Sequence, residues 1–157
     1  MSDSIHYRPA QRSDIPRMAA IWSLEKGEGG KSEESMLAYF DGELNPKKAL
    51  PPRVIFVAEE GDTLLGYLAG HLTTRLACQG ELEWIYVTPE RRRSGVASGL
   101  MPFLATWFQQ QQASRVCVNV AQWNTPAINF YARHGAEPMK PGWMVWSDFP
   151  RAILKPS

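Results

Sequence analysis

The 157-residue chain carries a formal net charge of +1, with 44% hydrophobic and 21% charged residues. This composition is typical of a folded globular chain and excludes an intrinsically disordered one, and the small net charge gives no general attraction to nucleic acid or membranes. No apolar run reaches the ~20 residues of a membrane span. Because the N-terminus also lacks a basic-then-apolar signal pattern, we expect a cytoplasmic protein with one domain, 1–157.

The first forty residues predict one strand and two helices. Residues 5–10 are typical of a strand, and the segment 13–16 carries the start signals of a helix that continues through 18–22. Three glycines between 25 and 35 break the hydrophobic periodicity, so we expect a mobile loop there before a second helix at 36–40. The acidic residues of this loop predict a solvated surface or, alternatively, a site that attracts a cationic amine: Glu25, Glu28, Glu33 and Glu34.

A hairpin and a third strand follow. Residues 54–59 and 64–72 flank a turn sequence that is typical of a hairpin, and the next strand ends in the apolar run 82–87. Glu81 and Glu83 lie two residues apart on this strand, and therefore on one face. Burial and mutual repulsion would raise the pKa of one carboxyl toward the range of a general base, unless this end of the strand is exposed and both are solvated.

The turn after this strand predicts an anion site. It leads into a helix at 100–108, whose first N–H groups converge on one point where the helix dipole adds partial positive charge. Gly95 and Ala97 leave room for a pyrophosphate to approach these amides. The turn lacks the sequences of the P-loop and of the dinucleotide-binding folds. Its arginines suit phosphate contact or a solvated loop: Arg91, Arg92 and Arg93.

The last third of the chain predicts a strand, a short helix and a final strand. Residues 115–120 alternate as a strand does, and 143–146 predict another strand after a link that contains two prolines. Between them, Thr125 is suited to the N-cap of a helix, Pro126 to its first helical position and Gly135 to the position that ends it. Pro102, in the preceding helix, is expected to bend that helix.

The cysteines and histidines give no indication of a metal site. Cys78 and Cys117 lack the spacing of metal ligands, which predicts buried or incidental thiols. The three histidines, His6, His71 and His134, show neither pairing nor metal spacing. We therefore expect structural roles for all three.

Two segments resemble the GCN5-related N-acetyltransferases (the GNAT family). Residues 92–97, preceded by Val-x-Pro at 87–89, are similar to the family's acetyl-CoA signature, Arg/Gln-x-x-Gly-x-Gly/Ala. Residues 124–136 resemble its second segment, in which Asn-x-x-Ala-x-x-Phe-Tyr is followed by Gly. The resemblance spans nearly the whole chain and implies an α/β (α+β) fold, a mixed and mostly antiparallel sheet flanked by helices and splayed near Val87 to admit acetyl-CoA. The residues it implies for the cosubstrate are Val87, Arg92, Arg93, Ser94, Gly95, Val96, Ala97 and Asn124.

The resemblance implies transfer of an acetyl group from acetyl-CoA to a primary amine by direct attack. Such a reaction uses a base and an acid but no covalent enzyme intermediate. We favour Glu83 as the base because it lies nearer the turn, with Glu81 as the other candidate, and Tyr131 as the acid for the CoA sulfur. Asn124 would hydrogen-bond the pantetheine arm, or serve only as a turn or cap residue.

Several alternatives stay open. A catalytically silent acyl-CoA-binding sensor or interaction domain would keep the fold and lose the reaction, and a different acyl donor is also compatible with the sequence. The acceptor could be a polyamine, an aminoglycoside, an amino acid or a protein N-terminus, with Trp22, Trp123 and Trp143 as aromatic walls. The expected partners are acetyl-CoA and an amine, without nucleic acid or membrane, and a homodimer is compatible with the resemblance.

Overall fold

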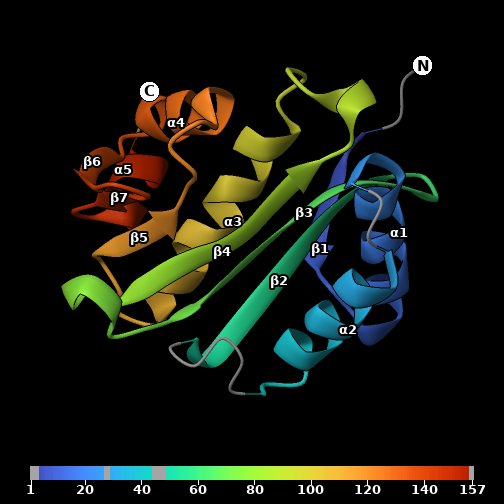
Figure 1. Ribbon diagram of the computed structural model, residues 1–157, viewed down its shortest axis with the longest axis horizontal. Helices are drawn as coiled ribbons and strands as arrows, with labels where there is room; N and C mark the ends of the chain where they lie inside the picture. Colours follow the sequence, from blue (N-terminus) through green and yellow to red (C-terminus); the bar gives the residue numbers. More distant parts are fainter. Residues whose placement is uncertain (1–3, 27–28, 44–48, 156–157) are drawn as a thin grey trace.

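The computed structural model describes residues 4–26, 29–43 and 49–155. A seven-stranded sheet crosses its centre in the order β1-β2-β3-β4-β5-β7-β6 (Figure 1). All neighbouring strands are antiparallel except β4 and β5, which are parallel, and this confirms the mixed, mostly antiparallel sheet. The strands are β1 (His6–Pro9), β2 (Leu50–Glu60), β3 (Thr63–Leu72), β4 (Gly80–Val87), β5 (Val116–Asn119), β6 (Glu137–Lys140) and β7 (Trp143–Trp146).

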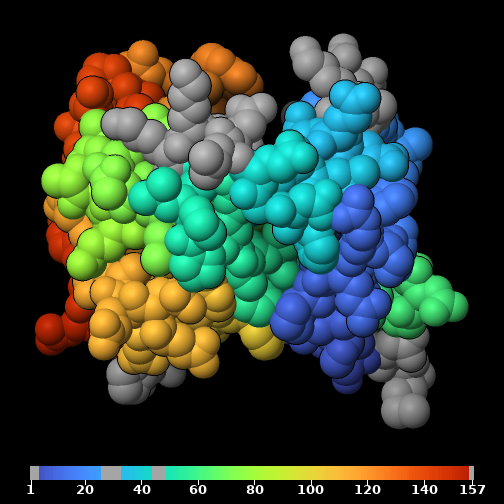
Figure 2. Space-filling view, turned by 90° about the horizontal axis from the view of Figure 1, so that it is seen from below, coloured from blue at the N-terminus to red at the C-terminus, as the bar shows by residue number. Residues whose placement is uncertain are grey.

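Helices cover both faces of the sheet. Helices α1 and α2 pack on β2 and β3 from one side, and α3 crosses the other side against β2, β3 and β4 (Figure 1). Seen from below, the cyan surface of α2 lies beside the teal surface of β2 (Figure 2). The helices are α1 (Ile15–Lys26), α2 (Gly29–Phe40), α3 (Val96–Gln110), α4 (Thr125–Arg133) and α5 (Phe149–Leu154), with short 3-10 helices η1 (Arg12–Asp14), η2 (Arg75–Ala77) and η3 (Pro89–Arg91).

The core has a layer on each face of the sheet. Along β2, Ile55 and Val57 join the cluster under α1 and α2, while Phe56 and Ala58 join the cluster under α3. A strand buried on both faces must be apolar at successive positions, which explains the unbroken hydrophobic runs of the central strands. Among the described residues, no helix combines the length and the hydrophobicity that a membrane crossing requires.

The structure corrects the expected loop at 25–35. Helix α1 continues to Lys26 and α2 begins at Gly29, so most of this segment is helical, and residues 27–28 lie outside the described part. The glycines gave the wrong boundary because helix propensity is a weak local preference. Burial of Met36 and Tyr39 against the sheet stabilises the helix by more than the low helix propensity of the glycines destabilises it.

Two elements near the C-terminus were not predicted. The proline-containing link forms β6, which pairs with β7 at the edge of the sheet, where proline is tolerated. Helix α5 follows, with Asp148 as its N-cap: the carboxylate accepts from the backbone N–H of Arg151 at 3.2 Å. Both elements complete the wall behind the short helix α4.

Strands β4 and β5 separate soon after they meet. Their pairing runs only from Gly80–Val116 to Leu82–Val118, so the last five residues of β4 have no partner on this side. The register with β3 also shifts on β4, because Ala69 lies opposite Trp84 while Gly70 lies opposite Leu82. Glu83 is therefore the extra residue of a β-bulge, a feature that often re-aims side chains beside functional sites.

Candidate active site

A cleft of about 820 Å³ lies at the unpaired end of β4, a volume within the range of small-molecule sites. The end of β4 forms one wall, and the first turn of α3 and the length of α4 form the others. A larger hollow of about 940 Å³ beside α5 contains none of the predicted site residues. The cleft is therefore the better candidate, since all the residues predicted to bind the cosubstrate line it except Ser94, whose hydroxyl donates to the Arg91 carbonyl instead.

The N-terminus of α3 opens into this cleft. Gly95 is the N-cap residue, with φ at +88°, and no side chain caps the helix. The first backbone N–H groups of α3, at Val96 and Ala97, therefore remain available to an anion. The positive φ requires glycine, and a Cβ built at Gly95 would meet no atom within 4 Å, so open space borders the turn. This space and these donors fit the pyrophosphate of acetyl-CoA.

The arginines of the turn have different partners. Arg92 makes two hydrogen bonds to the Glu25 carboxylate, at 2.6 and 2.9 Å, and its Nε donates to the Val87 carbonyl at 3.0 Å. Arg91 pairs with Glu60 at 2.8 Å. Arg93 lines the cleft and makes no ion pair with any residue that the structure describes, so its guanidinium is the one that remains for phosphate.

Helix α4 forms the far wall, and its N-cap differs from the prediction. Asn124, not Thr125, is the N-cap: its Oδ1 accepts from the backbone N–H of Ala127 at 3.3 Å. Asparagine is the stronger cap because its amide oxygen reaches the free N–H groups readily. Asn124 still lines the cleft, so its amide N–H groups remain available to a ligand. Gly135, with φ at +102°, ends the helix as the sequence predicts.

Tyr131 projects from α4 into the cleft. The residue is 6% exposed, and burial raises its pKa to about 12. Its ring packs edge-on against Trp146, with the ring centroids 5.8 Å apart. Its hydroxyl makes no hydrogen bond to any described residue, so a protonated O–H group is available to a ligand.

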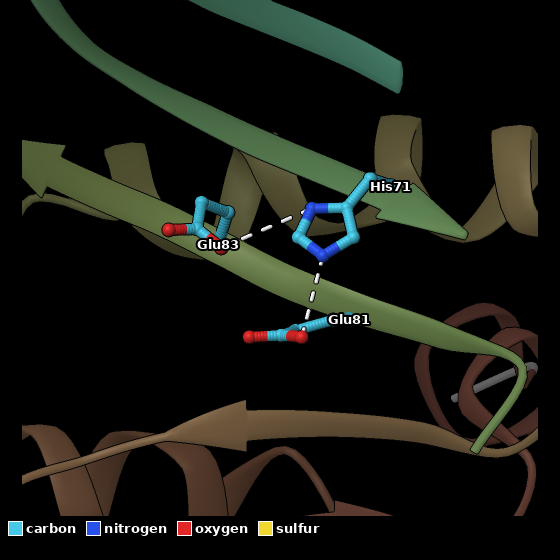
Figure 3. A group of neighbouring side chains, drawn as sticks. All are labelled: His71, Glu81 and Glu83. Atoms are coloured by element: carbon cyan, nitrogen blue, oxygen red, sulfur yellow. Dashed lines mark hydrogen bonds and ion pairs between the residues drawn. The ribbon is translucent and has the colours of Figure 1, made fainter. Parts of the chain in front are cut away.

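The two carboxylates of β4 lie on either side of a histidine from β3 (Figure 3). His71 Nε2 lies 3.3 Å from Glu81 Oε1, and its Nδ1 lies 3.9 Å from Glu83 Oε1. Arg75 Nε also donates to Glu81, at 3.2 Å. Burial, and then the charge of Glu81, raise the pKa of Glu83 above that of an ordinary glutamate. A raised pKa suits the Glu83 carboxyl to accept a proton closer to neutral pH.

The same three side chains have the ligand types of a metal site, with ligand atoms within 4.8 Å of one another. Their arrangement does not suit a shared ion. Glu81 approaches one ring nitrogen of His71 and Glu83 the other (Figure 3), whereas one metal ion binds through a single ring nitrogen. The Arg75 guanidinium already occupies the position of a cation beside Glu81.

Comparison with known proteins agrees with these features. Residues 16–136 match the family model described as the acetyltransferase (GNAT) family. The chain belongs to the GNAT family. It is 28% identical over 148 residues to the peptidyl-lysine N-acetyltransferase YiaC of Escherichia coli K12, with 94% of this chain and 93% of that protein covered. The GNAT assignment makes the protein an acyltransferase.

Solved structures share the GNAT fold at low sequence identity. An acetyltransferase from Thermus thermophilus superposes with a TM-score of 0.73 at 18% identity, covering 92% of this chain and 98% of that one. The PaiA N-acetyltransferase from Thermoplasma acidophilum, solved with coenzyme A, gives 0.63 at 16% identity, covering 90% and 96%. The structure thus confirms the expected α/β fold with flanking helices.

Sequence reasoning missed the position of His71 in this GNAT site. The antiparallel pairing of β3 with β4 places it directly opposite Glu81, and α2 brings the Tyr39 hydroxyl to its Nδ1 at 2.8 Å. The expectation that His71 has no partner was wrong, because its ring contacts both Tyr39 and Glu81. The signal that could have found it is the succession of two strands along the chain, which often pair, with ionisable residues at the ends that face the connecting segment.

Glu81 and Glu83 are not among the residues that line the cleft, and other candidate residues also lie outside it. Glu25 is engaged by Arg92, and Glu28 lies outside the described residues. Trp22 packs into the core under α1 and α2, while Trp123 is 82% exposed. Trp143 lies against Arg75, so the described part of the chain does not assemble these tryptophans into one aromatic wall. Both cysteines are buried and free, as the sequence predicts.

Proposed function

We propose that the protein transfers the acetyl group of acetyl-CoA to a primary amine by direct attack. The observation that carries the proposal is that one cleft borders both the N-terminus of α3 and the part of β4 that does not pair with β5. The uncapped N-terminus of α3 offers N–H donors, and the unpaired end of β4 offers a strand edge beside them. A cosubstrate with a pyrophosphate at one end and an extended amide chain at the other matches both surfaces.

The individual contacts follow from this arrangement. The N–H groups of Val96 and Ala97 would hold the pyrophosphate, with Arg93 and Arg133 at the rim for the adenosine phosphate. The pantetheine arm would lie along β4 as an added strand and bond to its backbone near Val87. Arg92 does not serve as a phosphate ligand in this scheme, because Glu25 holds its guanidinium.

The reaction removes two protons from the acceptor ammonium and supplies one to the thiolate, so one proton is released overall. Glu83 accepts a proton from the acceptor ammonium, either directly or through water, and the neutral nitrogen attacks the thioester carbonyl. The C–N bond forms as the C–S bond breaks, and the second proton of the amine nitrogen replaces, directly or through water, the proton that Tyr131 gives to the thiolate. Tyr131 donates its hydroxyl proton to the departing thiolate, because a pKa of about 12 keeps that proton in place at neutral pH. The products are an amide and CoA.

A lysine side chain is the acceptor that we propose to test first. The relative YiaC is a peptidyl-lysine N-acetyltransferase by name, and it matches this chain over nearly its full length. The partly buried carboxylate Glu83, whose pKa is raised, is suited to receive a proton from a primary ammonium group. Small polyamines and amino acids belong in the same panel.

The other function that the fold allows is an acyl-CoA sensor without catalysis. Glu83 and Tyr131 argue against it, because a binding site needs neither a carboxyl with a raised pKa nor a free phenol. The discriminating experiment measures acetyl-CoA affinity by calorimetry and CoA release across lysine peptides, polyamines and amino acids. An enzyme gives turnover with some amine, and Glu83→Gln loses that turnover while its acetyl-CoA affinity stays the same. Tight binding without turnover on any acceptor would favour the sensor, and absence of binding would refute the assignment of the cleft.

A further inference from the structure

Tyr39, His71 and Glu81 form a buried chain of hydrogen bonds behind Glu83. The Tyr39 hydroxyl lies 2.8 Å from His71 Nδ1, and His71 Nε2 lies 3.3 Å from Glu81 Oε1. Tyr39 and His71 are at most 1% exposed, and Glu81 is 5% exposed. Figure 3 shows the imidazole ring between the two carboxylates, which both come from β4. Three elements distant in sequence, α2, β3 and β4, thus converge on one ring.

The chain fixes which ring nitrogen carries a proton. Burial, together with the charge of Glu83, raises the pKa of Tyr39, so its hydroxyl keeps its proton and has one to donate to His71 Nδ1 when Nε2–H donates to Glu81. The ring proton then lies on Nε2, from which it is donated to the Glu81 carboxylate. Arg75 supports the same assignment, because its Nε donates to Glu81 and favours the carboxylate form.

We propose that Tyr39 and His71 are positioning residues that keep the ring nitrogen beside Glu83 free of a proton, so that Glu83 remains available as the base. His71 Nδ1 lies 3.9 Å from Glu83 Oε1, too far for a hydrogen bond but close enough for a strong charge interaction. A proton on Nδ1 would pair with Glu83 and make it a weaker base. The consequence for catalysis rests on the proposed function, whereas the position of the ring proton does not.

Other charged or titratable groups around the ring also affect where its proton lies. Arg53 lies opposite His71 on β2 and contacts the ring of Tyr39, with Cζ 4.7 Å from the centroid. Cys117 lies opposite Glu81 on β5, and burial raises the pKa of its thiol, so it stays neutral. The charged or titratable groups that face the ring are Tyr39 on α2, Arg53 on β2, Arg75 on η2, Glu81 and Glu83 on β4, and Cys117 on β5. In a pH experiment, each variant should change only the residue under test and keep the others.

The position of the ring proton can be measured without any activity. Nitrogen-15 NMR of the labelled protein resolves the two neutral imidazole tautomers, and a His71→Gln variant identifies the resonances among those of the three histidines. At pH 7 we expect the Nε2–H tautomer at His71, unchanged by EDTA. An Nδ1–H tautomer or an imidazolium would overturn the proposal. A spectrum that changes on chelation would also overturn it, because that would identify a metal ion on the ring.

A double-variant cycle tests the consequence for the base. In Tyr39→Phe the donor to Nδ1 is lost, and we expect the acidic limb of kcat/KM to move to lower pH by roughly one unit, as an opposite charge at this distance lowers a carboxyl pKa. In the His71→Gln background, where no ring can take the proton, Tyr39→Phe should leave the limb in place. Equal shifts in both backgrounds would mean that Tyr39 acts on Glu83 without His71 and would refute the role of His71.

This design separates the inference from the proposed function. The acceptor amine titrates identically with every variant, so differences between pH profiles belong to the protein. If the wild type gave no turnover with any amine, the proposed function would fail, while the tautomer measured by NMR would still support or overturn the hydrogen-bond chain. Unfolding of Tyr39→Phe would leave the same NMR measurement on the wild type as the decisive test.

Discussion

Replacement of Tyr131 by phenylalanine removes one hydroxyl group and leaves the ring in place. That hydroxyl has no hydrogen-bond partner in the described part of the chain, and the ring contact with Trp146 is retained in the variant. We therefore expect the free energy of unfolding to change by less than about 0.5 kcal/mol. The fold and the acetyl-CoA affinity should be those of the wild type, so that any loss of rate reports on the chemistry.

The expected loss follows from the role of a general acid. Positioned proton donors contribute about 10²–10⁴-fold to a rate, so kcat should fall at least ~100-fold, equivalent to about 2.7 kcal/mol of transition-state stabilisation. The wild-type rate should also show no basic limb below about pH 11, because the pKa of Tyr131 is raised to about 12 and the acid keeps its proton until then.

The assay follows CoA release with a thiol reagent, beside calorimetric titration of acetyl-CoA and urea denaturation. Tyr67→Phe is the matched control, since Tyr67 is equally buried and does not line the cleft. A Tyr131→Phe enzyme within threefold of the wild-type kcat would refute the assignment of the acid. A loss explained entirely by weaker acetyl-CoA binding would refute it as well.

Three further predictions concern the cofactor turn and the stability of the fold. Gly95→Ala should cost about 1 kcal/mol in urea denaturation, because φ at +88° is strained for alanine, and should weaken acetyl-CoA binding in calorimetry; unchanged affinity would contradict the anion site. Arg93→Ala should weaken acetyl-CoA binding in a salt-dependent way, whereas Arg92→Ala should mainly lower the melting temperature; the reverse pattern would be inconsistent with the Glu25 pairing. Asp14→Asn should remove about 3 kcal/mol of stability at pH 7, since Arg8 holds the buried carboxylate at 2.7 Å and lowers its pKa. That difference should vanish as pH falls through the lowered pKa, because the wild-type carboxylate is then protonated, and a difference that persisted in acid would exclude this cause.

The strands of the core could be predicted because local patterns determine them. The apolar run on β2 and the turn at Gly61 give the hairpin, and the apolar run that ends at Val87 gives β4. The turn at Gly95 could be recognised as well, since a strand, a glycine and a helix in succession leave few geometries open. These features depend on neighbours in sequence.

The remaining features depend on contacts between distant segments. The role of His71 arises only when β3 pairs with β4 and α2 supplies Tyr39, a register that includes a bulge at Glu83. Helix α2 begins earlier than its glycines suggest, because burial of its later residues stabilises the whole helix. Arg92 belongs to the expected phosphate signature, yet a carboxylate 67 positions away directs its side chain to α1.

One measurement tests the central claim most directly. The protein is mixed with acetyl-CoA that carries a deuterated acetyl group and with an accepted amine, and mass spectrometry of acceptor and protein follows at times shorter than one turnover. Direct attack predicts the label on the acceptor amine and none on the protein at any time. A transient acetylated protein would contradict the roles of Glu83 and Tyr131, and label that stays on CoA with every amine would contradict the assignment of acetyl transfer to this cleft.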